Sequence, residues 1–152
     1  MTENLPVFAD VESLLRAEQP TRPVYCIYPH IYREVANEFL GGFPGRVLYA
    51  VKSNPDPTIV KLLSDAGICH FDCASLAEIE LADTIAPDAK KYFMTPVRIR
   101  GAARAAQEKH NVRHFVIDHM SALGPLLQEI DASMSVIFAR MAVHHESAFE
   151  DL

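Results

Sequence analysis

The chain has 152 residues, of which 49% are hydrophobic and 22% charged, and this balance is typical of one globular domain with a real core. A formal net charge of −6, with the basic residues scattered, excludes a nucleic-acid backbone or an anionic membrane surface as the main partner. We expect no signal peptide, because the polar, acidic N-terminus lacks a basic segment followed by an apolar one, and no membrane span, because no apolar run approaches ~20 residues.

The three cysteines (Cys26, Cys69 and Cys73) are odd in number and lie in apolar, strand-like segments. This usage favours reduced thiols in a cytoplasmic protein over a disulfide framework. A zinc site at 69–73 is disfavoured. On a strand the two cysteines point away from His70 and Asp72, and no second ligand pair has suitable spacing.

The first 40 residues differ from the rest of the chain. A short helix is predicted at 8–18, a lone strand at 23–28, and a second helix near 30–40 that ends at Gly41-Gly42. We interpret residues 1–40 as a helix and a strand that precede the main fold, the strand belonging to a separate β-domain that the chain would rejoin later.

From residue 41 onward, strand-like runs alternate with helical segments. Five runs start 22 residues apart: 47–51, 69–73, 91–95, 113–117 and 135–139. The helix after the first run has an N-cap at Asp56 and a closing Gly67, and the next begins at Ser75-Leu76-Ala77-Glu78, a capping-box pattern. Two more helices are predicted near 100–109 and 120–129.

Alternating strands and helices predict βα units and a parallel sheet, so the fold class is α/β. The regular period does not separate an open doubly wound sheet from a (β/α)8 barrel, and it also allows a solenoid, although no consensus recurs between the units. A barrel has eight units and typically ~250 residues. On that interpretation residues 41–152 form the first five or so units of a partial barrel.

Lys52 stands directly at the carboxyl end of the first strand-like run and is the principal candidate for chemistry. The carboxyl ends of parallel strands are where ligands bind, and Lys52 is predicted to share a strand face with Leu48 and Ala50. A desolvated lysine tends to lose its proton, and the neutral amine is the form that attacks a carbonyl carbon. The alternative is an ordinary surface lysine.

Two further charged residues end strand-like runs. Asp72 lies near the end of the second run and would share the edge with Lys52, either pairing with a cationic nitrogen or capping the next helix. Arg140 ends the fifth run and would donate to a phenolate or phosphate oxygen, or form a salt bridge. We interpret the adjacent pair His144-His145 as solvated.

Two segments carry a resemblance to a known family: Tyr49–Asn54 (YAVKSN) and Phe71–Ser75 (FDCAS). They resemble the ornithine/diaminopimelate/arginine decarboxylases, the fold-type III enzymes that use pyridoxal 5'-phosphate, and are more similar to the ornithine decarboxylase branch than to the diaminopimelate branch. Residues 135–142 (SVIFARMA) look like that family's fifth-strand segment. The resemblance covers roughly residues 24–152.

The resemblance implies a role for each matching residue. Lys52 matches the lysine that binds the cofactor covalently, Ala50 the residue packed beside the ring, Asp72 the aspartate near the bonded nitrogen, and Arg140 the arginine on the ring's oxygen side. It also implies that the strand at 24–28 belongs to a C-terminal β-domain and that the full protein is a homodimer.

The implied reaction is decarboxylation of a basic amino acid, most simply ornithine to putrescine in polyamine biosynthesis. The family's glycine-rich phosphate loop and several catalytic groups would lie beyond position 152, so we expect this chain alone to have negligible activity. Two alternatives stay open: a non-catalytic relative that binds a regulator or a decarboxylase subunit, and another fold-type III protein, such as a diaminopimelate decarboxylase or a relative of alanine racemase.

Overall fold

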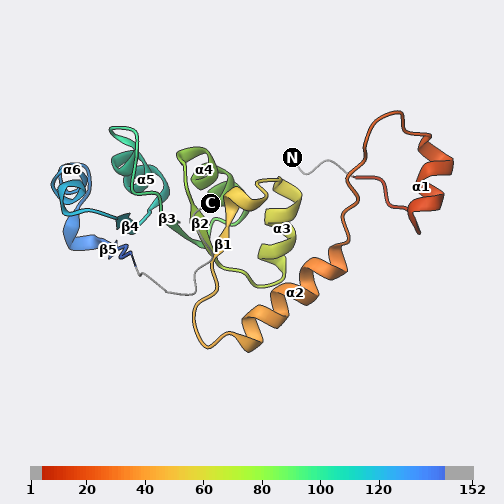
Figure 1. Cartoon of the computed structure of the whole chain (residues 1–152), viewed down its shortest axis with the longest axis horizontal. Coiled ribbons are helices and arrows are strands. Elements are labelled where there is room, and N and C mark those ends of the chain that lie inside the picture. The colour runs from red at the N-terminus through yellow and green to blue at the C-terminus, as the bar shows by residue number, and fades with distance from the viewer. Residues whose placement is uncertain (1–4, 143–152) are drawn as a thin grey trace.

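A computed structural model of the chain describes residues 5–142. It contains a five-stranded sheet with helices between successive strands (Figure 1). The strands are β1 (Tyr49–Ala50), β2 (His70–Cys73), β3 (Lys90–Phe93), β4 (His114–Ile117) and β5 (Val136–Ala139). The α-helices are α1 (Val11–Glu18), α2 (Pro29–Gly42), α3 (Pro57–Asp65), α4 (Leu76–Ile85), α5 (Ala102–His110) and α6 (Leu123–Leu127). Short 3-10 turns are η1 (Val51–Ser53), η2 (Met120–Ala122) and η3 (Ala132–Met134).

The strands lie side by side in chain order, and each pairs in parallel with the next. A doubly wound sheet would reverse this order at a switch point, whereas a barrel keeps it. The predicted α/β fold and its partial barrel arrangement are therefore confirmed. Within the described residues the sheet is open, with β1 and β5 at its two edges.

The core lies between the sheet and the helices that connect its strands. Phe71, Cys73, Phe93 and Phe115 are almost fully buried there, with Val51 beside them. Since side chains alternate along a strand, the residues between them point to the opposite face. We call that opposite face, which carries His70, Asp72, Tyr92 and His114, the open face of the sheet.

Local signals in the sequence account for the helix ends. Asp56 accepts a hydrogen bond from the Thr58 amide (2.7 Å), as an N-cap should. Gly67 has φ +102°, and its amide and that of Ile68 donate to carbonyls in the last turn of α3. This Schellman arrangement favours glycine, because other residues are strained at positive φ.

The cap of α4 differs in one detail from the predicted capping box. Ser75 Oγ accepts from the Glu78 amide (3.2 Å), as expected. The Glu78 carboxylate accepts from the amide of Ala74 (2.8 Å) instead of from that of Ser75. Glu78 therefore also holds the loop that joins β2 to α4.

Three predicted elements differ from the structure. β1 ends at Ala50, because the chain turns into η1, and Lys52 lies on that turn instead of on a strand. Residues 23–28 form no strand in the described structure, since a strand needs a hydrogen-bonded neighbour and this segment has none there. The helix predicted at 120–129 consists of η2 followed by the short α6.

The predicted division at residue 40 falls inside α2. This helix contacts α3 and contributes Ala36 to the core, whereas α1 has no buried residue. The assignment of residues 1–40 to a separate part of the protein stays a prediction. Among the described residues, no helix has the length and apolar character needed to cross a membrane.

Candidate functional site

Lys52 lies on the exposed turn η1, directly after β1. The preceding residue, Val51, is fully buried and fixes the turn to the core. On the far side of Lys52, the hydroxyl of Tyr49 donates to the carbonyl of Asn54 (3.1 Å). The turn is thus tied at both ends, and the amine is accessible at the carboxyl edge of the sheet.

Asp72 lies on β2, in register with Ala50 on β1. Burial raises the pKa of its carboxyl group; the charge of Lys52 lowers it, that of Glu78 raises it further, and that of Arg140 lowers it. Asp72 therefore lies within electrostatic range of both predicted cationic site residues. Lys52 and Arg140 come from opposite edges of the described sheet. The positive charges of both act on the carboxyl group of Asp72.

Arg140 directly follows β5, and its backbone amide donates to the carbonyl of Ile117 (2.8 Å) at the end of β4. Its guanidinium Nη2 donates to the carbonyl of Met94 (3.3 Å), just past β3. The side chain therefore extends across β4 toward the middle of the sheet. This direction brings its charge to the carboxyl edge near Asp72.

Two residues that were not among the predicted site residues, Arg98 and Tyr49, also shape this edge. Arg98 donates to the carbonyls of Thr95 (2.6 Å) and Val116 (2.8 Å), which fastens the loop after β3 to β4. Its guanidinium also lies 5.9 Å from the centre of the Phe93 ring. Burial lowers the pKa of Arg98, and nearby Glu129 and Asp118 oppose this. No local pattern marks Arg98, whereas the role of Tyr49 is suggested only by its place in the YAVKSN segment.

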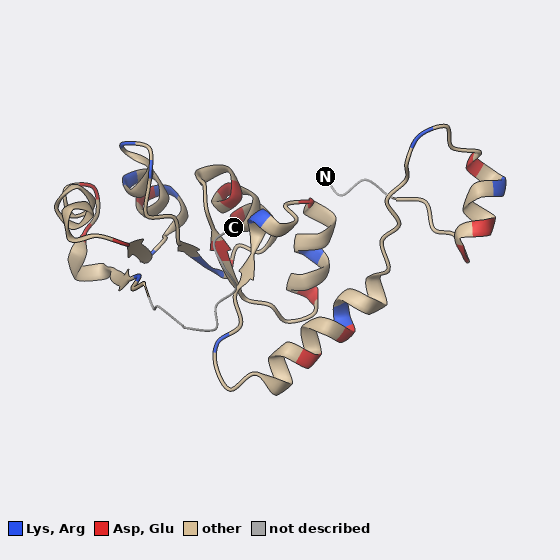
Figure 2. Ribbon diagram, in the orientation of Figure 1, with Lys and Arg blue, Asp and Glu red and all other residues tan. Residues whose placement is uncertain are grey.

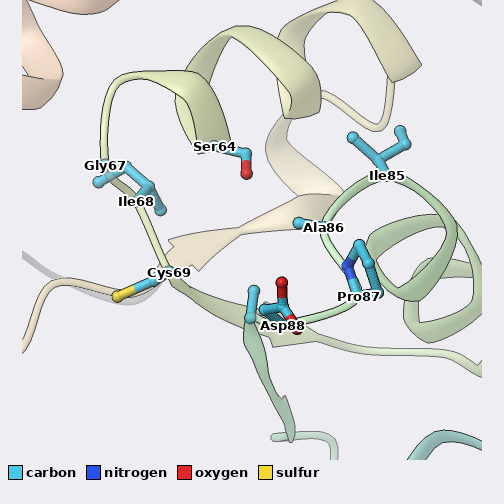
Figure 3. A pocket seen from close by; sticks show the side chains of 9 residues that line it. Ser64, Gly67, Ile68, Cys69, Ile85, Ala86, Pro87 and Asp88 are labelled. Carbon is cyan, nitrogen blue, oxygen red and sulfur yellow. The ribbon is translucent and has the colours of Figure 1, made fainter.

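Two hollows of the described structure lie away from this edge. One, of about 290 Å³, lies between the end of α3 and the α4–β3 loop (Figure 3). It adjoins Cys69 and Ala89, which precede β2 and β3, so it belongs to the amino ends of the strands. A second, almost entirely apolar groove of about 400 Å³ lies between α2 and β1. The candidate site is instead an accessible edge of the sheet. The predicted solvated pair, His144-His145, lies outside the residues that the structure describes.

Residues 30–152 match the family model described as "Pyridoxal-dependent decarboxylase, pyridoxal binding domain". The chain belongs to this family. The predicted family is thereby confirmed, and so is pyridoxal phosphate as the family's cofactor. The match covers every strand of the sheet and the three charged residues at its carboxyl edge.

Several curated relatives align with part of the chain. The lysine/ornithine decarboxylase of Selenomonas ruminantium is 33% identical over 107 residues, which are 70% of this chain and 26% of that protein. The ornithine decarboxylase of Saccharomyces cerevisiae is 39% identical over 77 residues (49% and 16%). The chloroplastic ornithine decarboxylase of Nicotiana glutinosa is 56% identical over 55 residues (35% and 12%). The aligned part is thus about a quarter or less of each relative.

Solved structures share the fold. The arginine decarboxylase of Paramecium bursaria Chlorella virus superposes with a TM-score of 0.80 at 23% identity, over 93% of this chain and 38% of that one. The ornithine decarboxylase of Entamoeba histolytica superposes with a TM-score of 0.64 at 25% identity, over 74% and 33%. The matching proteins are named for different substrates: arginine, lysine and ornithine. The comparisons therefore establish the family of this chain but not its substrate.

The residues at the carboxyl edge fit pyridoxal phosphate, which carries an aldehyde, a ring oxygen and a phosphate. Lys52 offers an accessible amine to the aldehyde carbon, and Arg140 offers guanidinium donors to an anionic oxygen. Ala50, which lies beside Asp72, has a side chain too small to obstruct a flat ring. Among the described residues, no group of three or more potential metal ligands comes together.

Proposed function

We propose that this protein takes part in the pyridoxal-phosphate-dependent decarboxylation of a basic amino acid, with Lys52 as the residue that bonds to the cofactor. The observation that carries the proposal is the convergence of Lys52, Asp72 and Arg140. Burial and the charges of the other two residues act together on the carboxyl group of Asp72. These three side chains come from β2, from the turn η1 after β1 and from the residue that follows β5, within a family whose domain binds pyridoxal.

Each residue has a distinct proposed task. Lys52 supplies a nucleophilic amine, which must be neutral when it attacks the aldehyde carbon. Asp72 would supply a carboxylate near the Lys52 nitrogen, where its negative charge would favour the charged form of that nitrogen. Arg140 donates hydrogen bonds to an oxygen on the ring side, and the small Ala50 leaves room for the ring. When bound, pyridoxal phosphate supplies an electron-withdrawing ring that accepts the electron pair left behind as carbon dioxide departs.

Asp72 is suited to this task because nearby positive charges help to keep its carboxyl group ionised. Its carboxyl group is half-buried, and burial alone disfavours the charged form. The positive charges of Lys52 and Arg140 counteract that penalty. Glu78, which accepts a hydrogen bond from the Ala74 amide, adds negative charge near Asp72, and this charge favours a cation beside the two carboxyl groups.

We propose ornithine as the substrate and putrescine as the product, in a full protein that is a homodimer of polyamine metabolism. Support for ornithine comes from the YAVKSN and FDCAS segments and from the relatives named ornithine decarboxylase, which reach 56% identity over the 55 residues aligned. Lysine and arginine are the competing substrates, because enzymes named for them share the fold.

The role of Lys52 is tested by covalent trapping. The purified chain is mixed with pyridoxal phosphate, reduced with borohydride, digested and mapped by mass spectrometry. We expect the label to concentrate on Lys52 and to disappear in Lys52→Arg, while Lys61→Arg, a change at an exposed lysine on α3, leaves the labelling unchanged. Label spread evenly over the lysines, or an unchanged total in Lys52→Arg, would contradict the proposal.

The substrate is tested separately. Release of carbon dioxide from labelled ornithine, lysine and arginine is measured with the full-length gene product. We expect the highest kcat/KM with ornithine. A preference for lysine or arginine would replace the substrate and keep the reaction, whereas no release from any of the three, despite specific trapping on Lys52, would contradict the decarboxylase assignment.

A further inference from the structure

The loop that joins β3 to α5 (residues 94–101) is tied to its neighbours through its first residue, Met94. Figure 2 shows Lys and Arg positions on this loop and just past β5. The Met94 amide donates to the carbonyl of Cys73 (3.1 Å), the last residue of β2, and the Met94 carbonyl accepts from Arg140 Nη2 (3.3 Å). Met94 therefore links Arg140 to the residue that follows Asp72.

Arg98 holds the chain directly after Met94. One nitrogen of its guanidinium, Nη1, donates to the carbonyls of Thr95 (2.6 Å) and Val116 (2.8 Å), so the loop is bound to β4. Fixing the Thr95 carbonyl restricts the backbone next to the Met94 carbonyl, which is the acceptor for Arg140. β3 and β4 each pair with a strand on both sides, so both partners of Arg98 lie within the part of the barrel that this chain forms.

Acidic neighbours balance the charge of Arg98. Burial lowers its pKa, and the negative charges of Glu129 and Asp118 oppose this effect. Glu129 is itself fixed at the far end of the same loop, because its carboxylate accepts from the Gly101 amide (2.7 Å). Arg98 therefore contributes to the carboxyl edge through its hydrogen bonds, since its charge is compensated nearby.

The charge of Arg98 is not among those that act on Asp72. Besides burial, the charges of Lys52, Glu78 and Arg140 shift the pKa of this carboxyl group. An effect of Arg98 on Asp72 must therefore pass through the position of Arg140. This difference makes a positioning role distinguishable from a direct electrostatic one.

We propose that Arg98 is a positioning residue for Arg140, because it fixes the backbone carbonyl that this guanidinium uses as an acceptor. Held in this way, Arg140 brings its charge to the carboxyl group of Asp72. The task of Arg140 toward a cofactor oxygen rests on the proposed function, whereas the coupling of Arg98 to Arg140 rests on hydrogen bonds within the chain.

The test is the titration of Asp72 in the full 152-residue chain, followed by the carbon-13 shift of its carboxyl group. We expect Arg98→Met to raise the pKa of Asp72, as Arg140→Met does, because the favourable charge is not held in place. Arg98→Lys should restore most of the original pKa, since both bonds of Arg98 leave from one nitrogen and an ammonium carries three donors. Arg104→Met removes an arginine–carbonyl bond to Gln128 (3.2 Å), away from this loop, and should leave the pKa unchanged.

A double-variant cycle separates positioning from a direct effect of charge. In the Arg140→Met background, Arg98→Met should cause no further rise in the pKa of Asp72, because no guanidinium remains to be positioned. An equal rise in both backgrounds would show that the two arginines act independently and would overturn the proposal. An unchanged pKa in Arg98→Met alone would overturn it as well. A mere loss of stability lowers the folded fraction without moving the pKa of the folded chain.

A measurement on the unsubstituted chain keeps the proposal testable if Arg98→Met does not fold. Nitrogen-15 relaxation of the arginine Nε groups reports side-chain motion on the picosecond to nanosecond timescale. We expect Arg98 and Arg140 to be ordered and the exposed Arg100 to be mobile. An Arg140 side chain as mobile as that of Arg100 would overturn the proposal.

The result is read separately from the trapping test of Lys52. If the label concentrates on Lys52 but the pKa of Asp72 does not respond to Arg98, the positioning role is overturned and the proposed function stands. If the pKa of Asp72 responds to Arg98 only while Arg140 is present, and no specific label forms, the positioning role is supported and the proposed function is contradicted.

Discussion

Replacing Asp83 with alanine should destabilise the fold far more than an ordinary change on a helix surface. Asp83 lies on α4, and one carboxylate oxygen accepts a hydrogen bond from Lys91 Nζ (2.5 Å) while the other lies 3.0 Å from His110 Nδ1. Lys91 is only 6% exposed, and its one other acceptor among the described residues is the carbonyl of Pro87 (3.2 Å). The substitution would leave a buried ammonium without its counter-charge.

The expected cost follows from the burial of Lys91. Breaking a buried ion pair by removing one partner typically costs 3–5 kcal/mol. The Asp83 side chain is 31% exposed, so water can partly replace it, and the better helix propensity of alanine returns a few tenths of a kcal/mol. We expect Asp83→Ala to lower the free energy of unfolding by about 2–4 kcal/mol.

Urea unfolding followed by circular dichroism measures this cost, with a double variant as the decisive control. Asp83→Ala combined with Lys91→Met removes both charges and should recover at least about half of the loss, since an apolar side chain suits the buried site. Asp65→Ala, which breaks the exposed pair with Lys61, should cost less than about 1 kcal/mol. If Asp83→Ala costs no more than Asp65→Ala, or if the double variant is less stable than the single one, the reasoning from burial is wrong.

Three further predictions concern the fold. The free energy of unfolding should decrease as the pH falls below about 6.5. The pKa values of His70 and His114 are lower in the folded chain than in the unfolded chain, so the unfolded chain takes up protons first. The stability contributed by the two neutral rings is therefore complete above the unfolded pKa and is lost as the pH falls toward the folded pKa values. Urea midpoints at pH 7.5 and 5.5 test this, and an unchanged midpoint would contradict it. Gly67→Ala should cost about 1–2 kcal/mol because its φ is +102°, whereas Gly41→Ala, in open space on α2, should raise stability by about 0.5–1 kcal/mol; thermal unfolding that orders the two variants the other way would refute the argument. Phe71→Ala should cost about 3–5 kcal/mol in urea unfolding, since the ring is fully buried, and a loss under 1 kcal/mol would show that the site is not packed as described.

The sequence was sufficient to predict the repeating βα units and most helix ends. Strand-like runs recur every 22 residues, and each cap depends on residues close together in the chain, as at Asp56, Gly67 and Ser75. Such signals act over one or two turns of helix and need no tertiary contact. The charged residues at the strand ends and the family resemblance were predictable for the same reason, since each rests on a short segment.

Contacts between distant segments required the tertiary structure. The shortening of β1 follows from the burial of Val51 and the Tyr49–Asn54 hydrogen bond, neither of which is visible in the apolar pattern of the run. The reach of Arg140 to Met94 depends on the order and register of three strands. The Asp83–Lys91–His110 contacts and the contact of Arg98 with Val116 likewise join separate elements. The sequence determined which segments become strands and helices, because local propensity and capping act between near neighbours. Only the folded sheet decided which side chains meet, because strand pairing sets the register across it.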